Sequence, residues 1–366
     1  MSYNVSLPSY SVGTDVYKLV GSICAGYGHK AVAIGGHKAM AAVKDKLCKA
    51  IIDSDIEISD FIWYGGEASY ENVENLMSLE AVRNADMLFA IGGGKATDTV
   101  KTLADMTGKP VFTFPTIASN CAACTSVSIM YNSDGTFLKP NFFVRPAMHA
   151  FIDTEIIAKA PVRYMWAGIG DTYAKYYEAC ISSRDERLEH FTALGVSISV
   201  MCQKPLLEYG AKAYEDHKKG LCTYEVEQVI LAIVVTTGIA SIFLTKDYTP
   251  DYNSGLAHAI FYALTSYPVI EKNHLHGEIV GFGVLLALLV DGQDEEFEKI
   301  YLLNKSISLP VSLDEIEISK EQWEESTDRI PDMSDVAHYP YKVTKEMLKN
   351  AMARLEEKVR KDNHVR

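Results

Sequence analysis

The sequence predicts two domains of different class: an α/β domain with a parallel sheet over residues 1–160 and an all-α domain over residues 161–366. The first prediction rests on short β-rich runs that alternate with helix-like segments, the pattern of strands joined by helical crossovers. The second rests on long segments with apolar residues at helical spacing and few strand signals after Ala160. A length of 366 residues is sufficient for two domains with separate cores.

The first half of the chain is expected to fold as alternating strands and helices. Strands are predicted where β-forming apolar residues run together, and helices where apolar residues recur every three or four positions. In chain order, beginning with a strand, the segments are Lys30–Gly36, Lys38–Ala50, Phe61–Gly66, Tyr70–Arg83, Asp86–Gly94, Lys95–Met106 and Pro110–Thr116. Ligands of such sheets bind at the carboxyl ends of the strands, so these ends are where a site is expected.

Three consecutive glycines stand at one of these ends, in the stretch FAIGGGKATDTVK from Phe89 to Lys101. Glycines permit a strand-to-helix turn with positive φ and let another molecule approach the main chain closely. A helix that begins there directs its free N–H groups and its positive dipole end toward an anion. We expect this anion to be a phosphate.

The composition argues against several classes of partner. Hydrophobic residues make up 48% and charged residues 23% of the chain, as in soluble globular proteins, and the net charge of −13 argues against nucleic acid and anionic membranes. Seven cysteines without a signal segment at the N-terminus fit a reducing cytoplasm. The longest apolar runs, Val229–Leu244 and Ile279–Val290, fall short of the roughly 20 residues of a spanning helix, so we expect core helices.

Three residues of the second half are candidate metal ligands: Asp171 in GIGDTYAKYYE, His258 in GLAHAIFYAL and His276 in NHLHGEIVGFG. Each alone has a simpler explanation, a helix N-cap for the aspartate and a hydrogen-bonded core residue for a histidine. Together, one carboxylate and two imidazoles make a three-ligand set with an open position, the layout of a catalytic divalent site. His274 competes with His276 for one ligand role, and spacing alone does not choose between them.

The stretch FPTIASNCAACTSVSIMY combines a strand end, small and hydroxyl residues, and an apolar strand. Small hydroxyl residues suit the lining of a narrow cleft, although an ordinary serine-rich loop would read the same way. Cys121 and Cys124 form a C-x-x-C pair without a second pair at zinc-site spacing, so no structural zinc is expected. A thioredoxin-type redox role is not expected either, since that motif opens a helix.

Five motifs, in this order, resemble the iron-containing alcohol dehydrogenase superfamily and most closely its glycerol dehydrogenase branch. They are GGGKATDTVK, PTIASNCAACTSVSIMY, GIGDTYAKYYE, HAIFYAL and HGEIVGFG, and the similarity covers about Ser11–Val290. The resemblance implies the dehydroquinate synthase-like and glycerol dehydrogenase-like architecture. In that architecture a Rossmann-like nicotinamide dinucleotide-binding domain precedes an all-helical metal- and substrate-binding domain, with a divalent metal in the cleft between them. It also implies a homo-oligomer.

The resemblance carries site residues over by position. Asp171, His258 and His276 match the metal triad, and Lys175 stands where the iron-using members have a fourth, histidine ligand, which favours zinc over iron. Gly93, Gly94 and Lys95 resemble the pyrophosphate loop, with Asp98 near the cofactor. The residues that resemble those lining the adenosine and nicotinamide riboses are Thr116, Ser119, Thr125, Val127 and Tyr131.

One departure from the branch concerns the substrate. Glycerol dehydrogenases carry an aspartate that binds the substrate's hydroxyl, where this chain has Cys121. A thiol is a weak hydrogen-bond partner and normally uncharged at neutral pH, so it does not repel a carboxylate. This favours a hydroxy or oxo acid over a polyol, and a similar cysteine-bearing stretch occurs in the related hydroxycarboxylate dehydrogenases.

A second departure concerns the dinucleotide. Members that prefer NAD usually have an acidic residue after the first strand, which binds the adenine ribose and repels a 2′-phosphate. This chain has Gly36, His37 and Lys38 there, so we predict that NADPH is used at least as well as NADH. The alternative is that His37 and Lys38 only begin a surface helix.

Together these features predict a cytoplasmic, metal-dependent NAD(P)(H) oxidoreductase that interconverts a small polyol or 2-hydroxy acid with its carbonyl form. His274 is the candidate for relaying the proton. A dehydroquinate synthase-like lyase is disfavoured because no cluster of basic residues accompanies the metal motifs. A cofactor-binding protein without turnover is disfavoured by the intact Asp171, His258 and His276 set.

Overall fold

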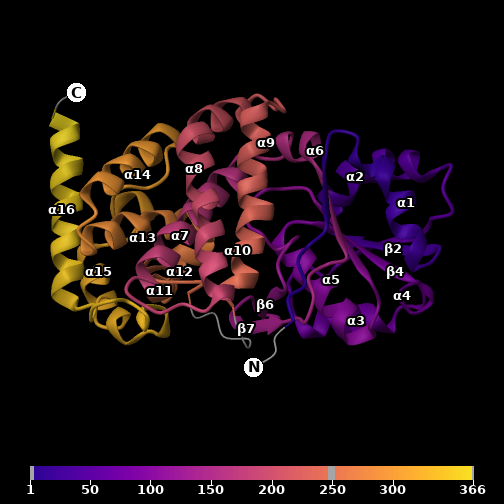
Figure 1. The fold of residues 1–366 in the computed structure, drawn as a ribbon, viewed down its shortest axis with the longest axis horizontal. Helices are drawn as coiled ribbons and strands as arrows, with labels where there is room; N and C mark the ends of the chain where they lie inside the picture. Colours follow the sequence, from indigo (N-terminus) through magenta and orange to yellow (C-terminus); the bar gives the residue numbers. More distant parts are fainter. Residues whose placement is uncertain (1–3, 246–251, 365–366) are drawn as a thin grey trace. The chain divides into compact units, whose positions relative to one another are not determined.

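The computed structural model describes residues 4–245 and 252–364, which form two compact units. Unit 1 contains the chain up to Pro161 together with Lys219–Cys222, and unit 2 contains Val162–Lys218 and the chain from Thr223 onward. A parallel sheet with covering helices lies in unit 1 and long helices make up unit 2 (Figure 1), which confirms the predicted fold class.

Unit 1 is built on a six-stranded sheet with the order β1-β8-β5-β4-β2-β3, in which every neighbouring pair is parallel. Its strands are β1 (Tyr10–Gly13), β2 (Lys30–Gly35), β3 (Glu57–Trp63), β4 (Met87–Gly92), β5 (Val111–Pro115) and β8 (His149–Asp153). A separate antiparallel hairpin consists of β6 (Val127–Tyr131) and β7 (Phe137–Phe142). Because β5, β4 and β2 are parallel neighbours, their carboxyl ends lie side by side at the same end of the sheet.

Helices cover both faces of this sheet because its central strands are apolar on both sides. Ala31 and Ala33 of β2 face one core, with α1 and α2, while Val32 and Ile34 face the other, with α3, α4 and α5. Figure 1 shows α1 and α2 on one side of β2 and β4, and α3 and α5 on the other. The helices of unit 1 are η1 (Val16–Leu19), α1 (Val20–Cys24), η2 (Ala25–Tyr27), α2 (His37–Ile51), α3 (Tyr70–Ser78), α4 (Glu80–Asn84), α5 (Gly94–Thr107) and α6 (Thr154–Ala158).

Three predicted boundaries in unit 1 are wrong. The helix expected over Tyr70–Arg83 is two helices, because Leu79 adopts an extended conformation (ψ 136°) and interrupts the run. The strand expected over Phe61–Gly66 begins at Glu57 and ends at Trp63, before Gly65 and Gly66 turn the chain with positive φ. Gly94 belongs to α5 and not to the preceding strand.

Among its described residues, unit 2 contains helices joined by loops and no strand. Its helices are α7 (Arg163–Ser182), α8 (His190–Lys218), α9 (Tyr224–Leu231), α10 (Thr237–Phe243), α11 (Leu256–Leu264), α12 (Pro268–Asn273), α13 (His276–Val290), α14 (Asp294–Ile307), α15 (Lys320–Ser326) and α16 (Lys345–His364), with short turns η4 (Asp314–Ile316), η5 (Ile330–Asp332) and η6 (Ser334–Val336). The long helix α7 packs against both α8 and α13, and α11 packs on α13.

One helical run of unit 2 is longer than the sequence suggested. A π-helical turn, η3 (Ala232–Thr236), joins α9 to α10, so the run extends over Tyr224–Phe243. By length and composition alone these 20 residues could cross a membrane. Within unit 2, however, 67% of the most apolar window is buried, which is the arrangement of a core helix.

Candidate metal centre and dinucleotide site

Three elements of unit 2 bring the predicted metal ligands together. Asp171 lies in the middle of α7, His258 in the first turn of α11, and His276 is the first residue of α13. Their candidate ligand atoms all lie within 4.8 Å of one another. Nε2 of His258 is 3.6 Å and Nε2 of His276 is 3.4 Å from Oδ1 of Asp171. The mid-helix position of Asp171 removes the alternative explanation that it caps a helix.

Glycines at the crossing of α7 and α13 set this geometry. A Cβ atom on Gly170 would lie 2.1 Å from the carbonyl oxygen of Gly277, and one on Gly277 would lie 2.0 Å from the carbonyl oxygen of Ala167. No side chain fits at either position without moving the two backbones apart. The glycines beside Asp171 and His276 therefore let the two ligands meet.

The electrostatics of the group suit a bound cation. Burial opposes ionisation of Asp171, but hydrogen bonds from His258 and His276 hold the pKa of its carboxyl well below the usual range. Burial also disfavours charge on His258, yet the carboxylates of Glu178 and Asp171 raise its pKa to about 10. Two buried negative charges thus surround a single imidazole, and a divalent ion would satisfy them. One carboxylate with two imidazoles is a donor set that zinc and iron both accept.

His274 does not join this group. Its Nδ1 lies 2.7 Å from Oε1 of Glu278, and its Nε2 lies 3.2 Å from Oε2 of Glu317 without hydrogen-bond geometry. Of the two histidines that competed in the sequence, only His276 belongs to the candidate metal group. The role of His274 as a proton relay stays a prediction.

Two charged residues of α7 extend the site along the same helix face. Lys175, at the position where the iron-using members have a fourth ligand, donates to the main-chain and side-chain oxygens of Asn253. Glu178 contacts His258, and the sequence reasoning missed it. The spacing could have indicated it, since Glu178 stands seven positions after Asp171 and such residues lie on the same face of a helix.

In unit 1, the three glycines lie at the carboxyl end of β4, of which Gly92 is the last residue. Gly92 has φ of +145°, a conformation that favours glycine, and Gly93 caps α5. A Cβ atom on Gly93 would lie 2.4 Å from Cδ1 of Ile117, and one on Gly94 would lie 2.6 Å from Nδ2 of Asn120. Positive φ therefore explains only the first glycine, whereas a Cβ atom at either of the other two would require the side chain of Ile117 or Asn120 to move.

Two ionic residues of α5 already have partners within unit 1. Lys95 lies 2.5 Å from Oε2 of Glu67, and its ammonium lies 5.2 Å from the ring centre of Tyr131. Asp98 is buried, pairs with Lys101 at 3.1 Å, and accepts the N–H of Ile129 at 3.2 Å. Asp98 thus anchors the β6–β7 hairpin to α5, while its predicted proximity to the cofactor stays a prediction.

The remaining dinucleotide candidates lie along the chain that leaves β5. Thr116 follows β5, and its N–H bonds the carbonyl of Gly92 at 3.3 Å. Thr125 accepts the N–H of Val127, the first residue of β6. Burial raises the pKa of the Cys124 thiol to about 12, so this thiol is unreactive. The other candidates on this stretch are Ser119 and Cys121 in the loop and Tyr131 at the end of β6.

The carboxyl end of β2 carries the residues predicted to meet the 2′-phosphate. Gly36 caps α2, and His37 stacks on the ring of Trp63 with a centroid distance of 5.5 Å and an angle of 13°. His37 and Lys38 are exposed in the first turn of α2, which contains no acidic residue. They do begin a surface helix, and this leaves both side chains accessible to an anion.

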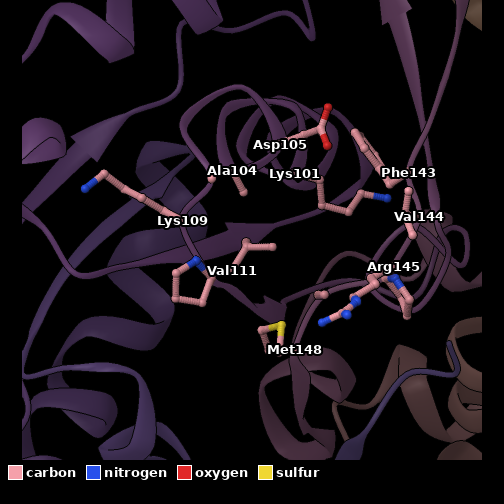
Figure 2. A pocket seen from close by; sticks show the side chains of 13 residues that line it. Lys101, Ala104, Asp105, Lys109, Val111, Phe143, Val144, Arg145 and Met148 are labelled. Atoms are coloured by element: carbon pink, nitrogen blue, oxygen red, sulfur yellow. The ribbon is translucent and has the colours of Figure 1, made fainter.

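Unit 1 also contains a pocket. Figure 2 shows Lys101 and Asp105 of α5, Val111 at the start of β5, and Arg145 and Met148 before β8 around it. The pocket adjoins the amino end of β5, whereas ligands of parallel sheets bind at the carboxyl end. No predicted site residue lines it.

Comparisons with known proteins point in one direction. The sequence profile described as iron-containing alcohol dehydrogenase matches residues 8–152. The chain is 31% identical to a glycerol dehydrogenase of Escherichia coli O6:H1, over 85% of this chain and 84% of the relative. It is 32% identical to hydroxycarboxylate dehydrogenase A of Escherichia coli K12, over 79% and 78%. The crystal structure of a probable glycerol dehydrogenase from Sinorhizobium meliloti 1021 superimposes with a TM-score of 0.81 at 25% identity, covering 98% of this chain and 99% of that one.

Proposed function

The chain belongs to the iron-containing alcohol dehydrogenase family and is an alcohol oxidoreductase, and from this premise we propose how its own residues act on the substrate. Its relatives are dehydrogenases of glycerol and of hydroxycarboxylates, which supports interconversion of a small polyol or 2-hydroxy acid with its carbonyl form. The same relatives do not favour a lyase of the dehydroquinate synthase type.

The observation that carries the proposal is the convergence of Asp171, His258 and His276 within 4.8 Å. These side chains would hold one divalent metal, with zinc favoured over iron by the three-ligand set. Such an ion supplies Lewis acidity toward the substrate's oxygen and favours loss of its proton. Asp171 contributes the charge and the two histidines contribute neutral nitrogen donors. His274 is proposed as the proton relay, and its Nδ1 is hydrogen-bonded to Oε1 of Glu278.

Unit 1 is proposed to bind the dinucleotide, whose nicotinamide exchanges hydride with the substrate. The first turn of α5, with Gly93, Gly94 and Lys95, offers free N–H groups and a positive dipole to the pyrophosphate. In this arrangement the Lys95 ammonium, which pairs with Glu67, would contact the phosphate as well. The stretch Thr116–Tyr131 is proposed to bind the two riboses. Asp98 holds this stretch against α5 by accepting the N–H of Ile129.

Further details of the proposal follow from individual residues. The exposed first turn of α2 supports use of NADPH at least as well as NADH. Cys121 in place of an acidic residue supports a substrate with a carboxylate. A homo-oligomer in the cytoplasm is proposed from the resemblance and from the composition of the chain.

The test is a rate comparison with zinc-loaded protein. Oxidation of NADPH and of NADH is followed with 2-oxobutanoate and with dihydroxyacetone, and the fastest turnover is expected for the oxo acid with NADPH. Removing the metal with a chelator should lower turnover at least about 100-fold, because a metal contributes several kcal/mol of charge stabilisation, and added zinc should restore it. Full turnover by protein shown to be metal-free would refute the metal site.

A further inference from the structure

Glu178 is a buried carboxylate of α7 that the proposed reaction does not use. Its side chain is 1% exposed, and its Oε1 accepts the backbone N–H of His258 at 3.0 Å. Its Oε2 lies 2.7 Å from Nδ1 of the same histidine. Both oxygens of one carboxylate therefore bind a single residue 80 positions further along the chain.

This contact decides which nitrogen of His258 keeps its proton when the ring is neutral, the form in which it binds a metal. An ionised carboxylate only accepts hydrogen bonds, so Nδ1 keeps the proton and is the donor to Glu178. Nε2 then presents its lone pair, and it lies 3.6 Å from Oδ1 of Asp171 within the candidate metal group. A metal binds at Nε2 only when the proton is on Nδ1, an arrangement that carboxylates commonly impose on ligand histidines.

We infer that Glu178 is a positioning residue, which holds His258 in the tautomer and orientation that a divalent metal requires. The inference rests on the proposed metal site. It assigns to that site a residue that acts through His258 and not as a ligand.

The chain before His258 is built to permit this contact. A Cβ atom on Gly255 would lie 3.0 Å from Cγ of Glu178, so a side chain at that position would require the Glu178 side chain to shift by a few tenths of an ångström. Lys175, on the same face of α7, donates to Oδ1 of Asn253 at 2.7 Å and to its carbonyl oxygen. Glu178 and Lys175 thus hold this segment of chain on both sides of Gly255.

His276 is oriented differently from His258. Within residues 4–245 and 252–364, no hydrogen bond reaches Nδ1 of His276, and its side chain is 43% exposed. Its ring stands edge-on to Phe261, with centroids 4.4 Å apart. Packing therefore orients His276, whereas a hydrogen bond orients His258, and loss of Glu178 should act on His258 alone.

The experiment replaces Glu178 by glutamine, which keeps the shape but turns one acceptor oxygen into an amide donor. The zinc Kd is measured by competition with a chromogenic chelator, and the visible absorption spectrum is recorded for the cobalt(II) form. Glu178→Gln should raise the zinc Kd about 10-fold to 100-fold, the usual effect of losing such a partner, and should change the cobalt spectrum. Glu178→Asp keeps the acceptors on a shorter arm and should raise the Kd less.

The matched control is Glu296→Gln on α14. This partly buried carboxylate accepts hydrogen bonds from Tyr177 at 2.7 Å and Gln203 at 3.1 Å in the same unit, but not from a metal ligand. Its zinc Kd and cobalt spectrum should match those of the parent protein.

An unchanged Kd and an unchanged cobalt spectrum in Glu178→Gln would overturn the inference. If that variant does not fold, the same result in Glu178→Leu, which removes both acceptor oxygens, would overturn it. A parent protein that binds no zinc would instead refute the proposed metal site, so the two failures are distinguishable.

Discussion

Lys38 occupies an unfavourable position for a lysine. It lies in the first turn of α2, where the helix dipole disfavours a positive charge. Within the described parts of the chain, no carboxylate pairs with its ammonium, whereas the neighbouring His37 stacks on Trp63. A bound phosphate would offset the dipole, which gives the lysine a physical reason to be there.

Lys38→Glu should therefore change the choice of dinucleotide. Loss of a charge-assisted contact to the 2′-phosphate costs about 1.5–3 kcal/mol, so kcat/KM for NADPH should fall about 10-fold to 100-fold. The value for NADH should change less than about threefold, since no 2′-phosphate is present. Lys44→Glu on the same helix is the control for the change in net charge. Equal losses for both dinucleotides would contradict the assignment.

Cys121→Asp tests the substrate assignment. A carboxylate there should repel an oxo acid and bind a polyol hydroxyl, so the ratio of kcat/KM for dihydroxyacetone to that for 2-oxobutanoate should rise at least about 10-fold, or 1.4 kcal/mol. Cys121→Ser controls for the loss of the thiol without adding charge. An unchanged ratio in the aspartate variant would place residue 121 away from the substrate.

At the scale of elements, α7 carries two separate functions on different sides. Its face with Asp171, Lys175 and Glu178 holds the candidate metal group and the chain that leads to His258. Gly170 of the same helix lies against the backbone of α13, where a Cβ atom on Gly170 would lie 2.1 Å from the carbonyl oxygen of Gly277. The position of the metal ligands therefore depends on a helix crossing that tolerates no side chain.

Gly170→Ala should destabilise the protein and weaken the metal site together. Overpacking of a close contact costs about 1–3 kcal/mol, and separation of α7 from α13 moves His276 away from Asp171. Gly210→Ala in α8 is the control, because its Cβ atom would meet only the flexible end of Leu303 at 3.3 Å and the gain in helix propensity is up to about 1 kcal/mol. Urea unfolding and zinc titration measure both effects. Equal stability of the two variants would refute the steric argument.

At the scale of the molecule, the chain divides into units that each have their own core. In unit 1 the two faces of the sheet bury separate apolar clusters, whereas unit 2 buries the faces of its helices against one another. The proposal assigns the dinucleotide to unit 1 and the metal to unit 2. A ligand that binds only the folded state stabilises the unit that binds it.

Zinc should accordingly raise the Tm of the chelator-treated protein. At a free concentration about 100-fold above its Kd, the expected stabilisation is about 2.7 kcal/mol, measured by calorimetry at fixed protein concentration. His258→Ala should abolish the effect of zinc while leaving stabilisation by NADPH intact. Equal stabilisation of the variant by zinc would show that the ion binds elsewhere.

The sequence by itself determined the class of each half and the residue types of the candidate site. Alternating β-rich and helical runs place β2, β4 and β5 in a parallel sheet, since period and length are local properties of the chain. The glycines after β4 are equally visible, because a strand-to-helix turn is specified by neighbouring residues. The sequence also gives the types and the order of Asp171, His258 and His276, and the family resemblance of the motifs that contain them.

Only the tertiary structure decided which residues meet. It grouped His276 and not His274 with Asp171, split the helix at Leu79, and joined Glu178 to a histidine 80 residues away. It also showed that only Gly92 of the three glycines has positive φ, whereas Gly93 and Gly94 lie against the side chains of Ile117 and Asn120. Local periodicity contains no information about such contacts, because each depends on how two distant segments cross once both are folded.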